Sequence, residues 1–116
     1  MIKFTILLRR HKEMSFEAFV AYHKTNHAPL FSLLPEVQQY VRKYVQCHAI
    51  AASLPGLPPP EYDGTTELWF DDVEAIGKVF GSERYMQVIR PDEEKFLDLT
   101  GCGFLVCQEH PVFTHE

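Results

Sequence analysis

The sequence has no long apolar run and no excess of basic residues, and each shortage excludes a class of protein. No apolar stretch approaches the roughly 20 residues that a membrane-spanning helix needs. The 116 residues include 11 Lys and Arg against 16 Asp and Glu, so no general basic character is present to bind nucleic acid. We therefore expect neither a membrane nor a nucleic acid as a partner.

Cysteine is scarce as well. Cys47, Cys102 and Cys107 are odd in number and lack the spacing of a disulfide framework, which favours a reducing compartment. The apolar N-terminal run ends at Arg9 without the small-residue cleavage site of a signal peptide. The sequence thus predicts a cytoplasmic protein.

Motifs for cofactors and activated nucleophiles are also missing. Gly101-Cys102-Gly103 is too short for a phosphate-binding loop and leads into a strand rather than a helix. No serine nucleophile elbow occurs, and Cys47 and His48 would point to opposite faces of a regular strand. We therefore expect no bound cofactor.

The composition and the length of the sequence are typical of one folded domain. Its residues are 46% hydrophobic and 13% aromatic, enough for a buried core and unlike a disordered chain. The length suits a single domain over residues 1–116, and no internal repeat or linker divides it.

The first half of the chain predicts a strand, a helix and a second strand. Period-two alternation predicts a strand at Ile2–Leu8 and another at 39–50. Between them an apolar stripe at helical spacing follows Ser15, a residue that can cap a helix. Pro29 is expected to kink or break this helix, and Pro35 to mark its end.

A proline-rich loop at residues 54–62 separates the two halves of the chain. Three roles remain open for this loop: a lid over the pocket, a clasp on a partner subunit, or a plain surface loop. The second half then repeats the order of strand, helix and strand. Strands are expected at Thr65–Phe70 and 103–109. Between them lie a helix capped by Asp71 or Asp72, helical residues at 82–89, and a short turn begun by Asp92. The order β-α-β-β-α-β predicts an α+β, ferredoxin-like fold, an antiparallel four-stranded sheet with helices on one face.

The other face of this sheet is expected to need a cover. Leu7, Tyr40, Tyr44 and Trp69 would lie opposite the helix-facing residues and form a large exposed patch. Such patches usually mark interaction surfaces. We therefore expect two copies to pair face to face as a homodimer, enclosing a pocket for a small hydrophobic ligand.

Four segments carry a resemblance to a known family. They are Phe16, Phe19 and Tyr22 followed by His27-Ala28-Pro29-Leu30; the strand 37–45 with Tyr40; Asp63-Gly64 followed by Glu67-Leu68-Trp69-Phe70-Asp71; and Asp92-Glu93-Glu94-Lys95-Phe96. In this order they cover nearly the whole chain, and together they resemble EthD-like proteins. His23 departs from the pattern, since the family often has a tryptophan directly after the residue that matches Tyr22.

The resemblance implies a dimeric α/β barrel. It also implies relatedness to small cofactor-free cyclases, isomerases and monooxygenases. The family's namesake is associated with gene clusters for the degradation of ethyl tert-butyl ether.

Two histidines at helical spacing are the first candidate site residues. His27 lies near the expected helix break, and its unperturbed pKa near 6.5 suits proton transfer at neutral pH. Its alternative is a helix-end histidine that packs against the core. His23 and His27 are four residues apart, as in some zinc sites, but no third ligand or general-base Glu accompanies them, so no metal is expected.

A second candidate set is expected on one strand face. It comprises Tyr40, Arg42, Tyr44 and His48 with Glu67 and Trp69 from the neighbouring strand. Hydroxyls, an imidazole and a carboxylate could abstract a proton next to a carbonyl and reprotonate the enolate. The alternative is a dimer interface in which Arg42 and Glu67 pair.

These residues leave two functions open. One is a cofactor-free isomerase, cyclase or lyase for a small apolar carbonyl compound, with a cofactor-independent monooxygenase as its variant. Its catalytic residues would be His27, Tyr40, Glu67 and His48, and its pocket Tyr22, His23, Arg42, Tyr44 and Trp69. The other is a non-catalytic protein that binds a hydrophobic metabolite for a partner monooxygenase. The acidic charge argues against a third possibility, an RNA-recognition domain.

Overall fold

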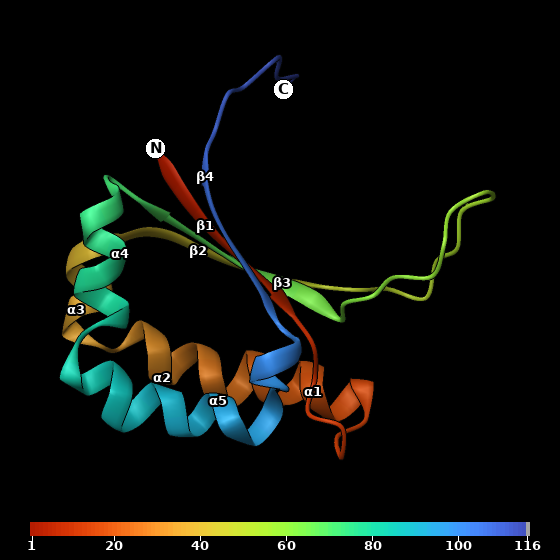
Figure 1. The fold of residues 1–116 in the computed structure, drawn as a ribbon, viewed down its shortest axis with the longest axis horizontal. Coiled ribbons are helices and arrows are strands. Elements are labelled where there is room, and N and C mark those ends of the chain that lie inside the picture. The colour runs from red at the N-terminus through yellow and green to blue at the C-terminus, as the bar shows by residue number, and fades with distance from the viewer. Residues whose placement is uncertain (116) are drawn as a thin grey trace.

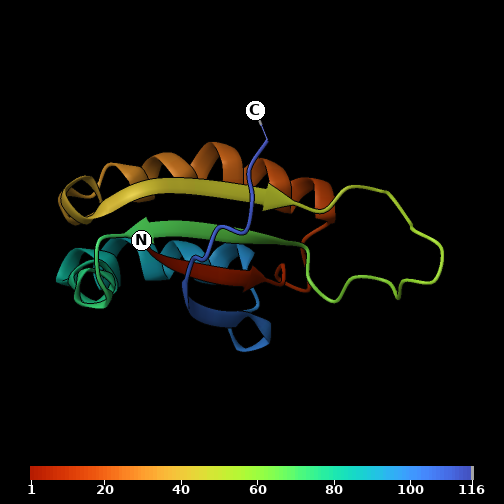
Figure 2. The same cartoon turned by 90° about the horizontal axis from the view of Figure 1, so that it is seen from above.

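The computed structural model of the protein describes residues 1–115 and arranges them as a four-stranded antiparallel sheet with helices over one face (Figure 1). Seen from above, the strands lie in the spatial order β2-β3-β1-β4 (Figure 2). Their bounds are β1 Ile2–Leu8, β2 Val41–His48, β3 Gly64–Phe70 and β4 Gly103–Gln108. This topology confirms the predicted ferredoxin-like α+β fold.

The first helical region joins β1 to β2 in four pieces. They are α1 Phe16–Tyr22, the π-helical turn η1 His23–His27, α2 Ala28–Ser32 and α3 Pro35–Tyr40. Ser15 caps α1 as predicted, its Oγ accepting the N–H of Ala18 at 3.1 Å. Pro35 begins α3 instead of ending the helical region, because proline is well placed in a first helical turn.

The expected break at Pro29 takes the form of the turn η1. Proline has no N–H, and its ring crowds the carbonyl four residues earlier. Just before it the helix widens, and the N–H of Ala28 bonds to the carbonyl of His23, five residues back. The helix continues through Pro29 without a sharp break, and η1 lies where His23 and His27 are buried.

The second helical region runs from β3 to β4. Its pieces are α4 Val73–Phe80, the π-helical turn η2 Tyr85–Ile89, α5 Arg90–Phe96 and the 3₁₀ turn η3 Leu99–Gly101. Asp72 is the cap of α4, accepting the N–H of Ala75 at 2.9 Å. The prediction of a short turn at Asp92 is wrong. Asp92 belongs to α5, because a π turn again precedes a proline, Pro91, and lets the helix continue.

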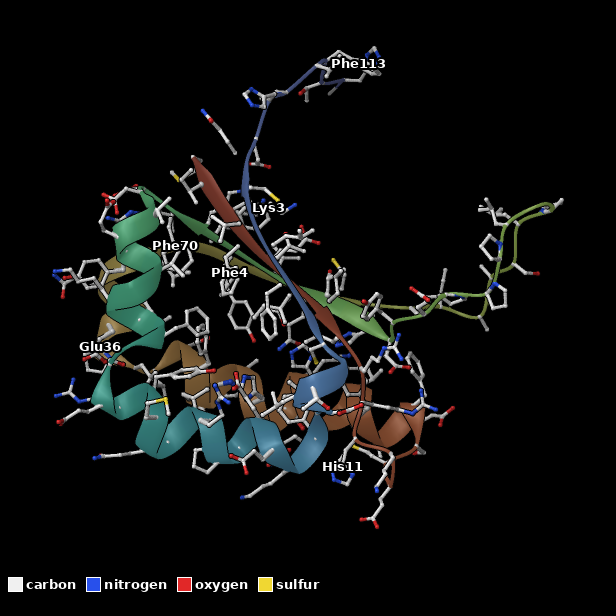
Figure 3. All side chains as sticks on the ribbon, in the orientation of Figure 1. Lys3, Phe4, His11, Glu36, Phe70 and Phe113 are labelled. Carbon is white, nitrogen blue, oxygen red and sulfur yellow. The ribbon has the colours of Figure 1, made fainter. Side chains whose placement is uncertain are left out.

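The register assigns the two faces of the sheet. Tyr44 pairs with Leu68, and Gln46 with Thr66, both of which are buried on the helix side. Phe4 points from the sheet towards the helices, whereas Lys3 points to the opposite side (Figure 3). The helix-facing residues are Phe4, Ile6, Leu8, Tyr44, Gln46, His48, Thr66, Leu68 and Phe70, and the opposite face carries Lys3, Thr5, Leu7, Lys43, Val45, Cys47, Thr65, Glu67 and Trp69.

The prediction that Tyr44 and His48 share a face with Glu67 and Trp69 is therefore wrong. A bulge between Val41 and Lys43 shifts the register of β2 against β3. Val41 consequently packs on the helix-side core, together with Tyr44. The more polar side of β2 faces the helices, where Gln46 and His48 bond to His23 and Tyr44 lines a cavity. Apolar character alone therefore did not identify the inner face.

Two groups of buried residues fill the space between sheet and helices. One is built around Phe31, Leu68 and Phe70, and the other around Phe19 and Phe96. Phe19, Phe70 and Phe96 are fully buried. Outside this core, residues 49–63 project as a long arm from the ends of β2 and β3 (Figure 2). Its base is closed by Arg10, whose guanidinium pairs with Asp63.

Shortening Phe96 tests the importance of this core. Phe96→Ala should lower the free energy of unfolding by about 3–5 kcal/mol, the usual effect of removing a buried phenylalanine ring. Phe113→Ala is a matched control because Phe113 is 76% exposed on the terminal segment, and it should change stability by less than about 0.5 kcal/mol. Urea titration of both variants measures the difference; equal values would contradict this assignment of the core.

Candidate functional site

A cavity of about 420 Å³ lies between the helix-facing side of the sheet and the helices. Its wall is mostly aromatic and aliphatic: Phe4, Ile6, Leu8, Phe31, Leu68, Ile76, Phe80, Phe96, Leu97, Leu99 and Phe104. A smaller set of polar residues also lines it: His23, His27, Tyr44, Thr66, Tyr85, Arg90, Glu93, Thr100 and Cys102. An apolar wall with a few polar groups is the usual construction of a small-molecule pocket.

His27 and Asp92 form a buried pair in this wall. Nδ1 of His27 lies 2.9 Å from Oδ2 of Asp92, and each residue is 6% exposed. The other carboxylate oxygen accepts the hydroxyl of Tyr22 at 2.5 Å. Asp92 thus fixes the tautomer with the proton on Nδ1 of His27.

The other nitrogen of His27 is left as a base. Residues 1–115 provide no hydrogen-bond partner for Nε2 of His27, and the ring lines the cavity. Burial lowers the pKa of His27, while the adjacent Asp92 carboxylate acts in the opposite direction. The neutral imidazole can therefore accept a proton from a molecule in the cavity.

His23, one turn before His27 on η1, forms an imidazole pair with His48. Its Nδ1 lies 2.9 Å from Nε2 of His48, and its Nε2 lies 3.3 Å from Oγ1 of Thr66. Gln46 donates to the backbone carbonyl of His23 at 2.9 Å. Burial, followed by the proximity of His27 and His48, lowers the pKa of His23 to about 3. His23 is therefore neutral throughout the physiological range.

A third polar group comes from η2 and α5. The Tyr85 hydroxyl donates to Oε1 of Glu93 at 2.5 Å, and Nε of Arg90 lies 3.7 Å from the same oxygen. Burial raises the pKa of Glu93 to about 7, so this carboxyl changes charge near neutral pH. Burial also raises the pKa of Tyr44 to about 12, which keeps its hydroxyl protonated as a donor.

The structure brings only part of the predicted site together. His23, His27 and Tyr44 line the cavity, while Tyr22 and His48 lie behind it, hydrogen-bonded to Asp92 and His23. The remaining predicted residues do not line this cavity. Tyr40 ends α3, Arg42 pairs with Asp71, Glu67 pairs with Lys3 on the opposite face, and the indole of Trp69 donates to Glu109.

Seven polar residues at the cavity were not predicted as site residues: Thr66, Tyr85, Arg90, Asp92, Glu93, Thr100 and Cys102. The sequence does contain a signal for three of them. Tyr85, Ile89, Asp92, Glu93 and Phe96 recur at helical spacing, so the two carboxylates continue an otherwise apolar stripe. Acidic residues on the buried side of a helix need hydrogen-bond or charge partners to be tolerated there. Buried ionisable residues held by such partners are typical of functional sites.

Residues 1–115 contain no group of three or more His, Cys, Asp or Glu side chains arranged to hold a metal ion. None of the helices over the same residues combines the length and the apolar character that crossing a bilayer requires.

The fold and the cavity define a ferredoxin-like α+β domain with a largely apolar cavity between its sheet and its helices. The chain belongs to the EthD family, because the model of the EthD domain matches residues 11–100. This assignment confirms the resemblance seen in the sequence. No curated protein sequence matches the chain.

Solved structures support the same fold. An ethyl tert-butyl ether D family protein of Bacillus halodurans is 17% identical, with 95% of this chain and 99% of that chain covered and a TM-score of 0.71. A dimeric protein of ferredoxin-like fold from Bacteroides fragilis is 10% identical, with 93% of this chain and 95% of that chain covered and a TM-score of 0.64. A DABB family protein from Mesorhizobium loti is 16% identical over 97% of each chain, with a TM-score of 0.55. At these identities the likeness shows the fold alone.

The buried neutral state of His23 predicts a loss of stability in acid. Its pKa is about 3 in the folded protein against an ordinary value of 6.5, so its contribution is complete above pH 6.5 and is lost as the pH falls towards 3. Through this residue the free energy of unfolding should drop by about 2 kcal/mol between pH 7.5 and 5.0.

The test compares urea titrations at the two pH values. His23→Gln should lose less stability in acid than the unaltered protein, whereas His110→Gln, at an exposed position, should behave like the unaltered protein. An identical change in stability between the two pH values in all three proteins would show that His23 does not titrate differently in the folded state. Glu93 acts in the opposite direction: its raised pKa makes its contribution complete below 4.5 and lost as the pH rises through about 7.

Proposed function

We propose that this protein is a cofactor-free isomerase, cyclase or lyase that moves a proton on a small apolar carbonyl compound. The observation that carries the proposal is the Tyr22–Asp92–His27 chain of hydrogen bonds, which leaves one free imidazole nitrogen on the wall of an apolar cavity. A base whose tautomer is fixed by a carboxylate is the arrangement that general-base catalysis requires.

The chemistry follows from the positions of three groups. Nε2 of His27 removes a proton from the carbon next to the carbonyl; the C–H electron pair moves into the new C–C double bond, and the carbonyl π pair moves to the oxygen. The resulting enolate oxygen needs a donor, and Tyr44, whose hydroxyl stays protonated, takes the role that the sequence had assigned to Tyr40. Return of the proton from Nε2 to a different carbon completes an isomerisation. In a cyclisation the enolate carbon attacks a second carbonyl, whose π pair moves to its oxygen, and this alkoxide takes the proton from Nε2.

The surroundings of His27 support this role. Asp92 stabilises the imidazolium that forms, and the ring of Phe96, centred 4.9 Å from the imidazole, excludes water from one side. The apolar wall binds the carbon skeleton of the ligand at about 25 cal/mol per Å² of buried surface. We expect such an activity to belong to degradation or secondary metabolism.

Exchange of C–H for C–D in heavy water measures the proposed step without knowledge of the product. With benzoylacetone as the probe, the protein should accelerate deuterium incorporation between the two carbonyls, followed by NMR. His27→Ala should lower the accelerated rate by about 100-fold or more, the usual contribution of a general base. Asp92→Asn should lower it as well, because the amide no longer fixes the tautomer or stabilises the imidazolium.

His110→Ala is the matched control, since His110 is exposed and outside the cavity. Unchanged exchange in His27→Ala would overturn the enzymatic proposal. Binding of benzoylacetone without exchange would favour the alternative, a non-catalytic protein that holds a hydrophobic metabolite for a partner monooxygenase.

We also propose that a second copy of the chain covers the face of the sheet opposite the helices. Leu7, Val45, Trp69 and Leu105 bring apolar surface to this face, and the Bacteroides fragilis neighbour of the same fold is described as dimeric. Contiguous surface of this kind on a sheet is a usual dimer interface.

A charge at this face should separate the copies. Leu105 is half exposed on β4, so Leu105→Lys should leave the protomer folded but convert a dimer to a monomer in sedimentation or native mass spectrometry. Leu33→Lys, at an exposed position on the helix side, should remain dimeric. A monomeric unaltered protein would overturn the proposal.

A further inference from the structure

The polar residues of the cavity lie in two places, and only one of them serves the proposed proton transfer. The first set, His27, His23, Thr66 and Tyr44, comes from η1, β3 and β2 and includes the proposed base and the proposed donor. Arg90, Glu93 and Tyr85 come from η2 and α5 and take no part in that chemistry. The second set needs a separate explanation, because charged groups are expensive to place beside an apolar cavity.

Arg90 lies at the mouth of the cavity. It lines the cavity, yet 43% of its side chain is exposed to solvent. Two other lining residues, Thr100 and Phe104, are also exposed, and both lie beside or on the edge strand β4. The mouth therefore opens between α5 and β4, and a ligand entering there passes the guanidinium.

The guanidinium of Arg90 forms no hydrogen bond to a carboxylate within residues 1–115. Its Nε is buried without a partner, and the nearest carboxylate oxygen, Oε1 of Glu93, is too distant at 3.7 Å. That oxygen already accepts the hydroxyl of Tyr85 at 2.5 Å. The terminal nitrogens of Arg90 form no hydrogen bond to a carboxylate of residues 1–115, so they are the donors offered to another acceptor. A guanidinium matches a carboxylate with two parallel hydrogen bonds.

We infer that Arg90 is the binding site for a carboxylate on the ligand, so that the substrate is an apolar keto acid with its carboxylate at the mouth and its reacting carbonyl deeper in the cavity. This inference deepens the proposed function by specifying the substrate class. It concerns binding alone, so it can be tested without turnover.

Glu93 gives this subsite a dependence on pH. The groups facing Glu93 are Tyr85 from η2, Arg90, Asp92 and Glu94 from α5, Tyr44 from β2 and Cys102 next to β4. Below a pH of about 7 Glu93 is protonated, and the charge of Arg90 is available to an anion. Above it the Glu93 carboxylate competes for Arg90 and repels the ligand.

The experiment compares a carboxylate with its neutral isostere. Binding of 2-naphthoate and 2-naphthamide is measured by calorimetry at pH 6.0 and 8.5. The unaltered protein should bind the acid about tenfold more tightly than the amide at pH 6.0, in proportion to one charge-assisted pair of hydrogen bonds. This preference should shrink several-fold at pH 8.5.

Three variants locate the effect. Arg90→Met should abolish the preference for the acid, and Arg90→Lys should keep only part of it, because an ammonium lacks the planar fork. Arg84→Met is the matched control: Arg84 is exposed, pairs with Glu36 and does not line the cavity, so the preference should persist. Glu93→Gln should remove the dependence of the acid preference on pH. If Arg90→Met fails to fold, the pH dependence of this preference in the unaltered protein still tests the inference.

Equal or undetectable binding of acid and amide by the unaltered protein would overturn the inference, as would an equal loss in Arg84→Met and Arg90→Met. The result is separable from the proposed function. If the unaltered protein shows the acid preference but no accelerated deuterium exchange, the proposed enzyme is rejected and the carboxylate subsite stands. If it shows exchange but no acid preference, the subsite is rejected and the proposed enzyme stands.

Discussion

The arrangement of the cavity depends on one buried carboxylate. Asp92 is almost inaccessible to water, and an ionised carboxylate in such a position must be hydrogen-bonded to be tolerated. Its two oxygens bind Tyr22 and His27, both from the first helical region, while Asp92 itself belongs to the second. The same contacts that satisfy the charge therefore hold the two helical walls at a fixed separation and orient the imidazole between them. Structure and candidate chemistry rely on the same atoms.

Much of the fold could be predicted because strands and helices differ in hydrophobic period. The strand expected at Ile2–Leu8 has those bounds, and the cap at Ser15 forms as its hydroxyl predicts. The errors lie where the period carries no information. A proline in a sequence predicts an interruption, but the widened turns before Pro29 and Pro91 let both helices continue. Hydrogen bonds between residues five apart leave no signature in the spacing of apolar residues.

The site was predicted less completely than the fold. His27, His23 and Tyr44 were found because histidine and tyrosine at regular spacing are conspicuous, while the face of β2 was misassigned because the inner side of a strand that borders a cavity can be the more polar one. Asp92 was read as part of a turn, and its role depends on residues 65 and 70 positions away in the chain. Pairings over such distances are set by the packing of helices and cannot be inferred from local spacing.

The π turn at His23–His27 has a consequence for how this region of the chain can change. A π turn contains one residue more than the α turn it replaces. Tyr22 and His27 are five residues apart and bind the same carboxylate, because a π turn brings residues at that spacing onto one face. In a regular α-helix only residues three or four apart share a face. A further insertion between Tyr22 and His27 would therefore turn one of them away from Asp92, whereas the long arm at residues 49–63 can change its length without moving either.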